Sequence, residues 1–271
     1  MPSTAAHPMH GLRGEQRVCP TPEEAARVLA ARLSAHLGQR LAGFSTVHWA
    51  LSGGSSAKLL GPALAVEGFL SASQWSRMHV WMVDERCVSD DDPRLNFNLV
   101  RDALLAGTPL PSANLHPMPV LEAHGAARYE ADLRAALAER PSVEDRRLDA
   151  VVLGMGADGH TASLFPESPA LDEDQRLVVL NDGDRVMPPR PRMTMTYPLL
   201  NRACWIALLV TGASKRPALE RVLTTPRDFH ALPITGIVPA PGSRLLWCLD
   251  QAAAPTGLWA TGDMDTTTVS G

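Results

Sequence analysis

Features that mark special classes of protein are scarce in this chain of 271 residues. It has four cysteines with no C-x-x-C pair, so the sequence offers neither a disulfide framework nor a cysteine-based metal site. No apolar run reaches the roughly 18 residues that a membrane-spanning helix needs. The formal net charge of −4 gives no general attraction for nucleic acid or for an anionic membrane. Any anion site must therefore be built locally from arginine, lysine and backbone N–H groups.

Linker-like segments and shifts of composition are also missing. We therefore expect a single α/β domain over residues 21–251, preceded by a flexible N-terminal tail (residues 1–20) and followed by a C-terminal tail (residues 252–271). The first residues contain no apolar stretch of signal-peptide length. The scattered cysteines are expected to be buried free thiols, which predicts a cytoplasmic protein.

Short apolar runs alternate with segments of helical periodicity along most of the chain. Helices are expected at residues 21–38, 58–65 and 123–139, and a further helix ends near residue 223. Strands are expected at residues 46–51, 78–83, 149–153, 177–180, 193–196, 203–210 and 243–249. This alternation predicts a mainly parallel sheet with helices on both faces, and its functional turns gather where the strands end.

The turn after the strand at residues 149–153 carries the strongest functional signal. Gly154, Gly156 and Gly159 surround Asp158, and His160 follows directly. Glycine allows a sharp turn and a close approach to a ligand, and imidazole is the side chain whose charge changes near neutral pH. We interpret the segment as an active-site turn that presents His160 as a base, with Asp158 placed to orient it or to hold a water molecule.

The same glycines also match the dinucleotide-binding pattern G-x-G-x-x-G, with acidic residues at positions 172–174. That pattern requires a helix to begin inside the motif, and Pro166 and Pro169 leave no room for one. We therefore interpret the match as accidental. No two histidines stand at the spacing of metal ligands on a helix, so neither a metal nor a nucleotide cofactor is expected.

Three other segments could contact a ligand. The sequence S-G-G-S-S at residues 52–56, called the Ser/Gly loop below, lies between a predicted strand and a predicted helix. It is either a flexible turn or an anion site made of backbone N–H groups. T-G-A-S-K at residues 211–215 has the same context and directs Lys215 into the turn. D-E-R at residues 84–86 ends another strand, as a solvated edge or as a ligand-facing cluster.

The sequence L-G-M-G-A-D-G-H-T-A-S-L-F-P at residues 153–166 resembles the signature of the 6-phosphogluconolactonases. The resemblance extends from about residue 46 to residue 250, with the motifs S-G-G-S, D-E-R, P-x-R-x-T and G-A-x-K in the family's order. It implies the modified Rossmann-like fold that lactonases share with glucosamine-6-phosphate deaminases, ribose-5-phosphate isomerases and CoA transferases.

The resemblance also implies an activity, the hydrolysis of 6-phosphoglucono-1,5-lactone in the oxidative pentose phosphate pathway. His160 and Asp158 would be catalytic, without any cofactor. The implied phosphate site consists of Ser52, Gly53, Gly54, Ser55, Arg86, Arg192 and Lys215. The expected partner is the sugar-phosphate lactone alone, with no nucleic acid and no membrane, and the expected state is a monomer or a weak homodimer.

Two departures from the family pattern and two rival functions are relevant. Ser56 and Ala57 replace Thr-Pro, and Leu95 replaces a serine before Asn96. A deaminase of the same fold would carry D-E-Y and G-H-x-A-F-N-E-P, whereas this chain has Arg86 and continues T-A-S-L-F-P after His160. A sugar-phosphate-binding regulator would lack His160 or carry a DNA-binding module. Both comparisons favour the lactonase.

Overall fold

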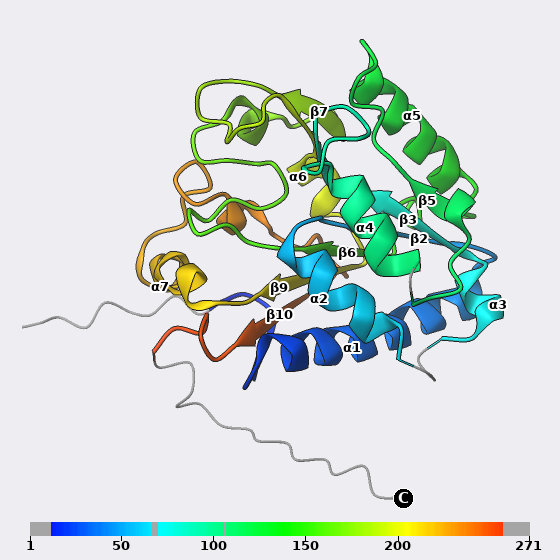
Figure 1. Ribbon diagram of the computed structural model, residues 1–271, viewed down its shortest axis with the longest axis horizontal. Coiled ribbons are helices and arrows are strands. Elements are labelled where there is room, and N and C mark those ends of the chain that lie inside the picture. Colours follow the sequence, from blue (N-terminus) through cyan, green and yellow to red (C-terminus); the bar gives the residue numbers. More distant parts are fainter. Residues whose placement is uncertain (1–11, 67–69, 106, 257–271) are drawn as a thin grey trace, which may run out of the picture.

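A seven-stranded sheet forms the centre of the structure (Figure 1), and every neighbouring pair of its strands is parallel. The computed structural model describes residues 12–66, 70–105 and 107–256. In spatial order the strands are β1 (Glu15–Cys19), β10 (Arg244–Asp250), β9 (Trp205–Val210), β6 (Ala150–Leu153), β2 (Val47–Leu51), β3 (Met78–Met82) and β5 (Leu115–His116). The expected mainly parallel α/β sheet is confirmed.

Helices cover both faces of this sheet. Its central strands are mainly apolar and fully buried, as in parallel sheets covered on both sides. The strand register places Trp205 and Trp81 on opposite faces. His36 of α1 (Pro22–Gly43) contacts Trp205, with ring centroids 5.4 Å apart, and Tyr129 of α5 (Gly125–Ala138) packs edge-on against Trp81.

The remaining helices connect the strands. On the side of α1, α2 (Ser55–Leu64) packs between α1 and α4 (Asn96–Leu105). The short helices are α3 (Ala72–Trp75) and α6 (Tyr197–Leu200), and α7 (Arg216–Thr224) precedes the last strand. No helix in the described part of the chain is both long and apolar enough to span a bilayer.

A second, three-stranded sheet was not expected from the sequence. β4 (Asp84–Arg86) and β7 (Val178–Asn181) flank β8 (Arg192–Met195), and both pairs are antiparallel. Only Val83 separates β4 from β3 of the large sheet. The D-E-R motif is therefore a strand of the small sheet, held beside the carboxyl ends of the large one.

Some expected boundaries are wrong. Residues 15–19 were placed in a flexible tail, but they form β1 and pair with β10 along its length. The first helix does not stop at Gly38 and continues to Gly43. Ala253 and Ala254, placed in the C-terminal tail, are buried. Residues 1–11 and 257–271 of the two expected tails lie outside the described residues.

Candidate active site

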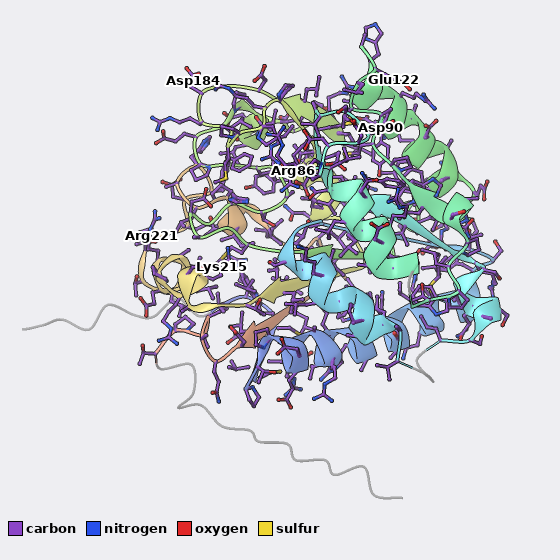
Figure 2. All side chains as sticks on the ribbon, viewed as in Figure 1. Arg86, Asp90, Glu122, Asp184, Lys215 and Arg221 are labelled. Atoms are coloured by element: carbon purple, nitrogen blue, oxygen red, sulfur yellow. The ribbon has the colours of Figure 1, made fainter. Side chains whose placement is uncertain are left out.

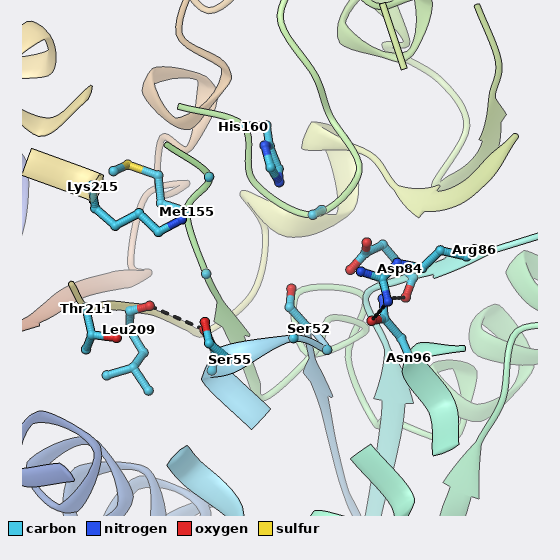
Figure 3. Close-up of a pocket in the computed structure, with 16 residues that line it drawn as sticks. Ser52, Ser55, Asp84, Arg86, Asn96, Met155, His160, Leu209, Thr211 and Lys215 are labelled. Atoms are coloured by element: carbon cyan, nitrogen blue, oxygen red, sulfur yellow. Dashed lines mark hydrogen bonds between the residues drawn. The ribbon is translucent and has the colours of Figure 1, made fainter. Parts of the chain in front are cut away.

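A pocket opens where β2, β6 and β9 end, and β4 and α4 close its far side. In Figure 3, Lys215 and Met155 lie on one side of the pocket, and Arg86, Asp84 and Asn96 lie on the other. The structure brings most of the sequence-predicted site residues together in its lining: Ser52, Gly53, Gly54, Ser55, Arg86, Gly154, Gly156, His160 and Lys215.

His160 is held by its neighbour in the same turn. Its Nδ1 lies 2.6 Å from Oδ1 of Asp158, and its backbone N–H donates to the same oxygen at 3.1 Å. Partial burial favours the neutral acid, but the hydrogen bonds from His160 outweigh it and hold the pKa of Asp158 below its ordinary value. An ionised Asp158 accepts a hydrogen bond from the N–H group at Nδ1, which leaves Nε2 of the neutral ring as an acceptor. Asp158 itself does not line the pocket, and neither does Gly159, which packs against Leu232.

The Ser/Gly loop forms the floor of the pocket. The backbone N–H of Ser52 donates to the carbonyl oxygen of Val152 at 3.0 Å, which joins the loop to β6. The hydroxyl oxygen of Ser52 is buried and has no hydrogen-bond partner among the described residues. Helix α2 begins at Ser55, so the free N–H groups of its first turn face this region. Such a helix start favours an anion.

Two cations from different parts of the fold, both labelled in Figure 2, line the pocket. Arg86 comes from β4, and Lys215 comes from the turn between β9 and α7. Nη1 of Arg86 donates to the backbone oxygen of Arg94 at 2.7 Å and to Oδ1 of Asn96 at 2.6 Å. Nε of Arg86 is buried and has no hydrogen-bond partner among the described residues. The guanidinium is thus fixed on one edge and has a free donor.

Arg192 is not where the sequence placed it. It does not line the pocket, and its guanidinium donates to the backbone oxygens of Met187 and Pro188 at distances of 3.0–3.3 Å. Burial and the neighbouring Arg86 lower the pKa of Arg192. In this structure the residue supports the Pro-rich loop at residues 187–191, because β8 directs its side chain back toward that loop.

Asp84 and Asn96 line the pocket but were not among the predicted site residues. Asp84 is buried, and its Oδ2 accepts from the hydroxyl of Ser163 at 2.7 Å, which ties the small sheet to the His160 turn. The D-E-R motif contained a signal for Asp84. The retained asparagine of the family pattern was a signal for Asn96, but neither motif indicates which side chains point inward.

Glu85 stands between Asp84 and Arg86 in β4 and is buried, with 1% of its surface exposed. Burial raises its pKa to about 7, even though three backbone N–H groups donate to its carboxylate and favour the ionised form. The carboxylate does not line the pocket.

The surroundings of the glycine turn differ from those of a dinucleotide-binding motif. No helix begins between Gly154 and Ser168, so the glycine turn does not open onto a helix as a dinucleotide motif requires. No group of three or more His, Cys, Asp or Glu side chains suited to a metal ion occurs in residues 12–66, 70–105 and 107–256.

Comparison with known proteins gives consistent matches. Residues 20–247 match the model of the family described as glucosamine-6-phosphate isomerases/6-phosphogluconolactonase. The chain is 42% identical over 207 residues to a 6-phosphogluconolactonase of Nostoc sp., a match that covers 75% of this chain and 82% of that protein. It is 39% identical over 242 residues to the rabbit GDH/6PGL endoplasmic bifunctional protein, covering 86% of this chain. The matched region spans only 29% of that longer relative.

Solved structures give the same result. The 6-phosphogluconolactonase from Shewanella baltica superposes with a TM-score of 0.72 at 26% identity, covering 88% of this chain and 98% of that one. A monomeric glucosamine-6-phosphate deaminase superposes with a TM-score of 0.68 at 19% identity and shares the fold. The chain belongs to the glucosamine-6-phosphate isomerase/6-phosphogluconolactonase family.

Proposed function

We propose that this chain hydrolyses 6-phosphoglucono-1,5-lactone to 6-phosphogluconate. The observation that carries the proposal is the His160–Asp158 pair beside a pocket whose floor is an anion-binding loop. The names of the relatives support it, since a Nostoc protein 42% identical to this chain is a 6-phosphogluconolactonase. The D-E-R and T-A-S-L-F-P sequences favour the lactonase over the deaminases of the same family.

The proposed reaction needs one base and one site for negative charge. Nε2 of His160 takes a proton as the oxygen of a water molecule attacks the lactone carbonyl, and Asp158 stabilises the imidazolium that forms. The carbonyl oxygen becomes an oxyanion in the tetrahedral intermediate. When that intermediate collapses, the bond to the ring oxygen breaks and the imidazolium returns the proton to the leaving oxygen. Water has then been added across the ester bond.

The proposed phosphate site is the Ser/Gly loop with Arg86 and Lys215. The start of α2 supplies N–H donors, and the two cations face one another across the pocket. The buried hydroxyl of Ser52 and Nε of Arg86, which have no hydrogen-bond partner among the described residues, are suited to hydrogen bonds with substrate oxygens. Arg192 is not included, because it holds the loop at Met187.

The proposal also covers the cellular compartment, the partners and the oligomeric state of the enzyme. We propose a reducing, cytoplasmic compartment, because all four cysteines are free and three of them are buried. We propose that the enzyme binds the substrate as its only partner and binds neither nucleic acid nor membrane. We further propose that the enzyme acts as a monomer or a weak homodimer.

A direct assay tests the proposal. Freshly prepared 6-phosphoglucono-1,5-lactone is mixed with the protein, and acid release is followed against the spontaneous rate. Glucosamine 6-phosphate is offered in parallel, and ammonia release is measured. We expect accelerated lactone opening and no ammonia. Ammonia release without lactone opening would assign the chain to the deaminase branch instead.

A further inference from the structure

Glu85 occupies an unusual place beside the pocket. It stands in β4 between Asp84 and Arg86, which both line the pocket, while its own side chain points away because side chains alternate along a strand. A carboxylate with 1% of its surface exposed is costly unless hydrogen bonds compensate for the lost water.

The compensating donors come from two separate segments. Oε1 of Glu85 accepts from the backbone N–H of Arg86 and from that of Asn96, both at 2.7 Å. Oε2 accepts from the backbone N–H of Phe97 at 2.6 Å. Asn96 and Phe97 are the first two residues of α4. The carboxylate therefore caps α4 and fixes that helix start against β4.

Asn96 connects the capped start of α4 to the pocket. Its Oδ1 accepts from Nη1 of Arg86 at 2.6 Å, and its Nδ2 donates to the backbone oxygen of Asp84 at 3.1 Å. The same side chain presses on the Ser/Gly loop, since a Cβ atom on Gly53 would lie 2.2 Å from Oδ1 of Asn96. One amide thus contacts both the guanidinium and the loop that face the ligand.

We propose that Glu85 is a positioning residue for anion recognition, which acts through Asn96 to aim Arg86 at the space above the Ser/Gly loop. The inference rests on the proposed function, in which that anion is the phosphate of the substrate. Without the carboxylate, the start of α4 loses its cap and Asn96 no longer meets Arg86 at hydrogen-bond distance.

A second buried glutamate provides a matched control. Glu130 of α5 also accepts from two consecutive backbone N–H groups, those of Leu177 at 2.8 Å and Val178 at 3.1 Å. It ties α5 to β7 and does not line the pocket. A purely structural role predicts the same consequences for Glu85→Gln and Glu130→Gln. Each substitution keeps the size of the side chain and places an NH₂ group against a backbone donor.

The test measures binding of inorganic phosphate and of 6-phosphogluconate by calorimetry, with thermal unfolding as the stability readout. We expect Glu85→Gln to raise both dissociation constants about tenfold, the scale of one lost bond to a charged group. Glu130→Gln should lower the unfolding midpoint and leave both constants unchanged. Because Glu85 acts through Arg86, the double variant Glu85→Gln/Arg86→Ala should bind no more weakly than Arg86→Ala alone.

Unchanged binding in Glu85→Gln, equal weakening in Glu130→Gln, or additive losses in the double variant would each overturn the inference. If Glu85→Gln does not fold, Asn96→Ala takes its place, with the same expected weakening and the same lack of additivity with Arg86→Ala. Lactone opening by the wild type is measured separately. A wild type that binds 6-phosphogluconate without opening the lactone refutes the proposed function alone. Phosphate binding that is absent in the wild type refutes this inference.

Discussion

His160 and Asp158 form a hydrogen-bonded pair within one turn, with Nδ1 2.6 Å from Oδ1. In the proposed mechanism, two residues of the same short segment supply both the base and the group that orients it. We expect His160→Ala to lower kcat for lactone hydrolysis about 10²–10⁴-fold, the usual contribution of a positioned base. Initial rates, corrected for spontaneous opening, provide the measurement, and binding of inorganic phosphate should persist. Near wild-type turnover would remove His160 from the mechanism.

Arg86→Ala and Lys215→Ala should weaken binding of 6-phosphogluconate roughly ten- to a hundredfold, because each removes a charged donor from the proposed phosphate site. Unphosphorylated gluconolactone should be a poor substrate for the wild type and about equally poor for these variants. Arg190→Ala is the control, since its exposed side chain pairs with Asp184. If Arg86→Ala impairs both lactones equally, that arginine has a structural role.

Gly156→Ala should reduce turnover about 10²-fold or more, since it displaces the base from its geometry. A Cβ atom at this position would lie 2.0 Å from Nδ1 of His160 and 2.4 Å from Oδ1 of Asp158. Gly43→Ala is the control, because nothing lies within 4 Å of a Cβ atom there. Steady-state kinetics measure kcat for the Gly156→Ala and Gly43→Ala variants. Equal kcat values in the two variants would contradict the prediction.

Three stacked histidines should make the fold sensitive to acid. His48 and His79 are paired across β2 and β3, and Nδ1 of His79 lies 3.0 Å from Nε2 of His116. Burial, followed by the neighbouring His79, lowers the pKa of His48 to about 3 and that of His116 to about 4, and burial also lowers the pKa of His79.

In the unfolded chain these groups titrate near their ordinary pKa of about 6.5. Above that pH these histidines are neutral in both states, so they contribute no pH dependence to the free energy of unfolding. As the pH falls below about 6.5, the unfolded chain takes up protons that the folded chain does not, so the free energy of unfolding decreases until the folded pKa values are reached. For the fully enclosed His48 the loss at pH 5 is roughly 2 kcal/mol.

Urea unfolding at pH 5 and pH 7 measures this effect. His48→Asn removes the titrating group and retains an acceptor for the indole N–H of Trp81, which donates to Nδ1 of His48 at 3.2 Å. The variant should lose less stability between pH 7 and pH 5 than the wild type. An identical pH dependence in the two proteins would exclude His48 as a source of acid sensitivity.

Catalysis should need neither a metal nor a nucleotide, because the reaction requires only an activated water and a polarised carbonyl. Enzyme dialysed against a strong chelator, and shown to be metal-free by elemental analysis, should keep its rate without added nucleotide. Activity that disappears and returns with a divalent ion would overturn this assignment of the site.

The sequence predicted the parts of the fold that have a local signal. β6 and β9 are uninterrupted apolar runs, and β2, β3 and β10 are mainly apolar, with one histidine in each of β2 and β3 and charged residues at the ends of β10. The glycines around Asp158 mark their turn by composition alone. β1 carries no such signal: Glu15, Gln16 and Arg17 are polar residues at the sheet edge, and they pair only because β10 offers free backbone groups. In the small sheet, β4 likewise depends on a distant partner, because Asp84 pairs with Thr194 of β8, 110 residues further along the chain.

For the candidate site as well, the sequence predicted the parts that have a local signal and missed those that depend on tertiary contacts. Motifs located His160, Arg86 and Lys215, but a motif does not indicate the direction of a side chain. Arg192 matches its pattern and yet turns toward the carbonyl oxygens of its own loop. Asn96 is held at the start of α4 by a tertiary contact, because its backbone N–H donates to the carboxylate of Glu85.

The central position of β6 has a consequence for the motions of the site. Its backbone N–H groups are enclosed between β2 and β9 and fully buried, so they should exchange with deuterium in the solvent only when the whole domain opens. Gly154 follows this strand directly, and the segment carrying His160 is therefore tethered to one of the last parts of the chain to open. Thermal fraying of peripheral elements such as β1 can then proceed without separating the histidine from its aspartate.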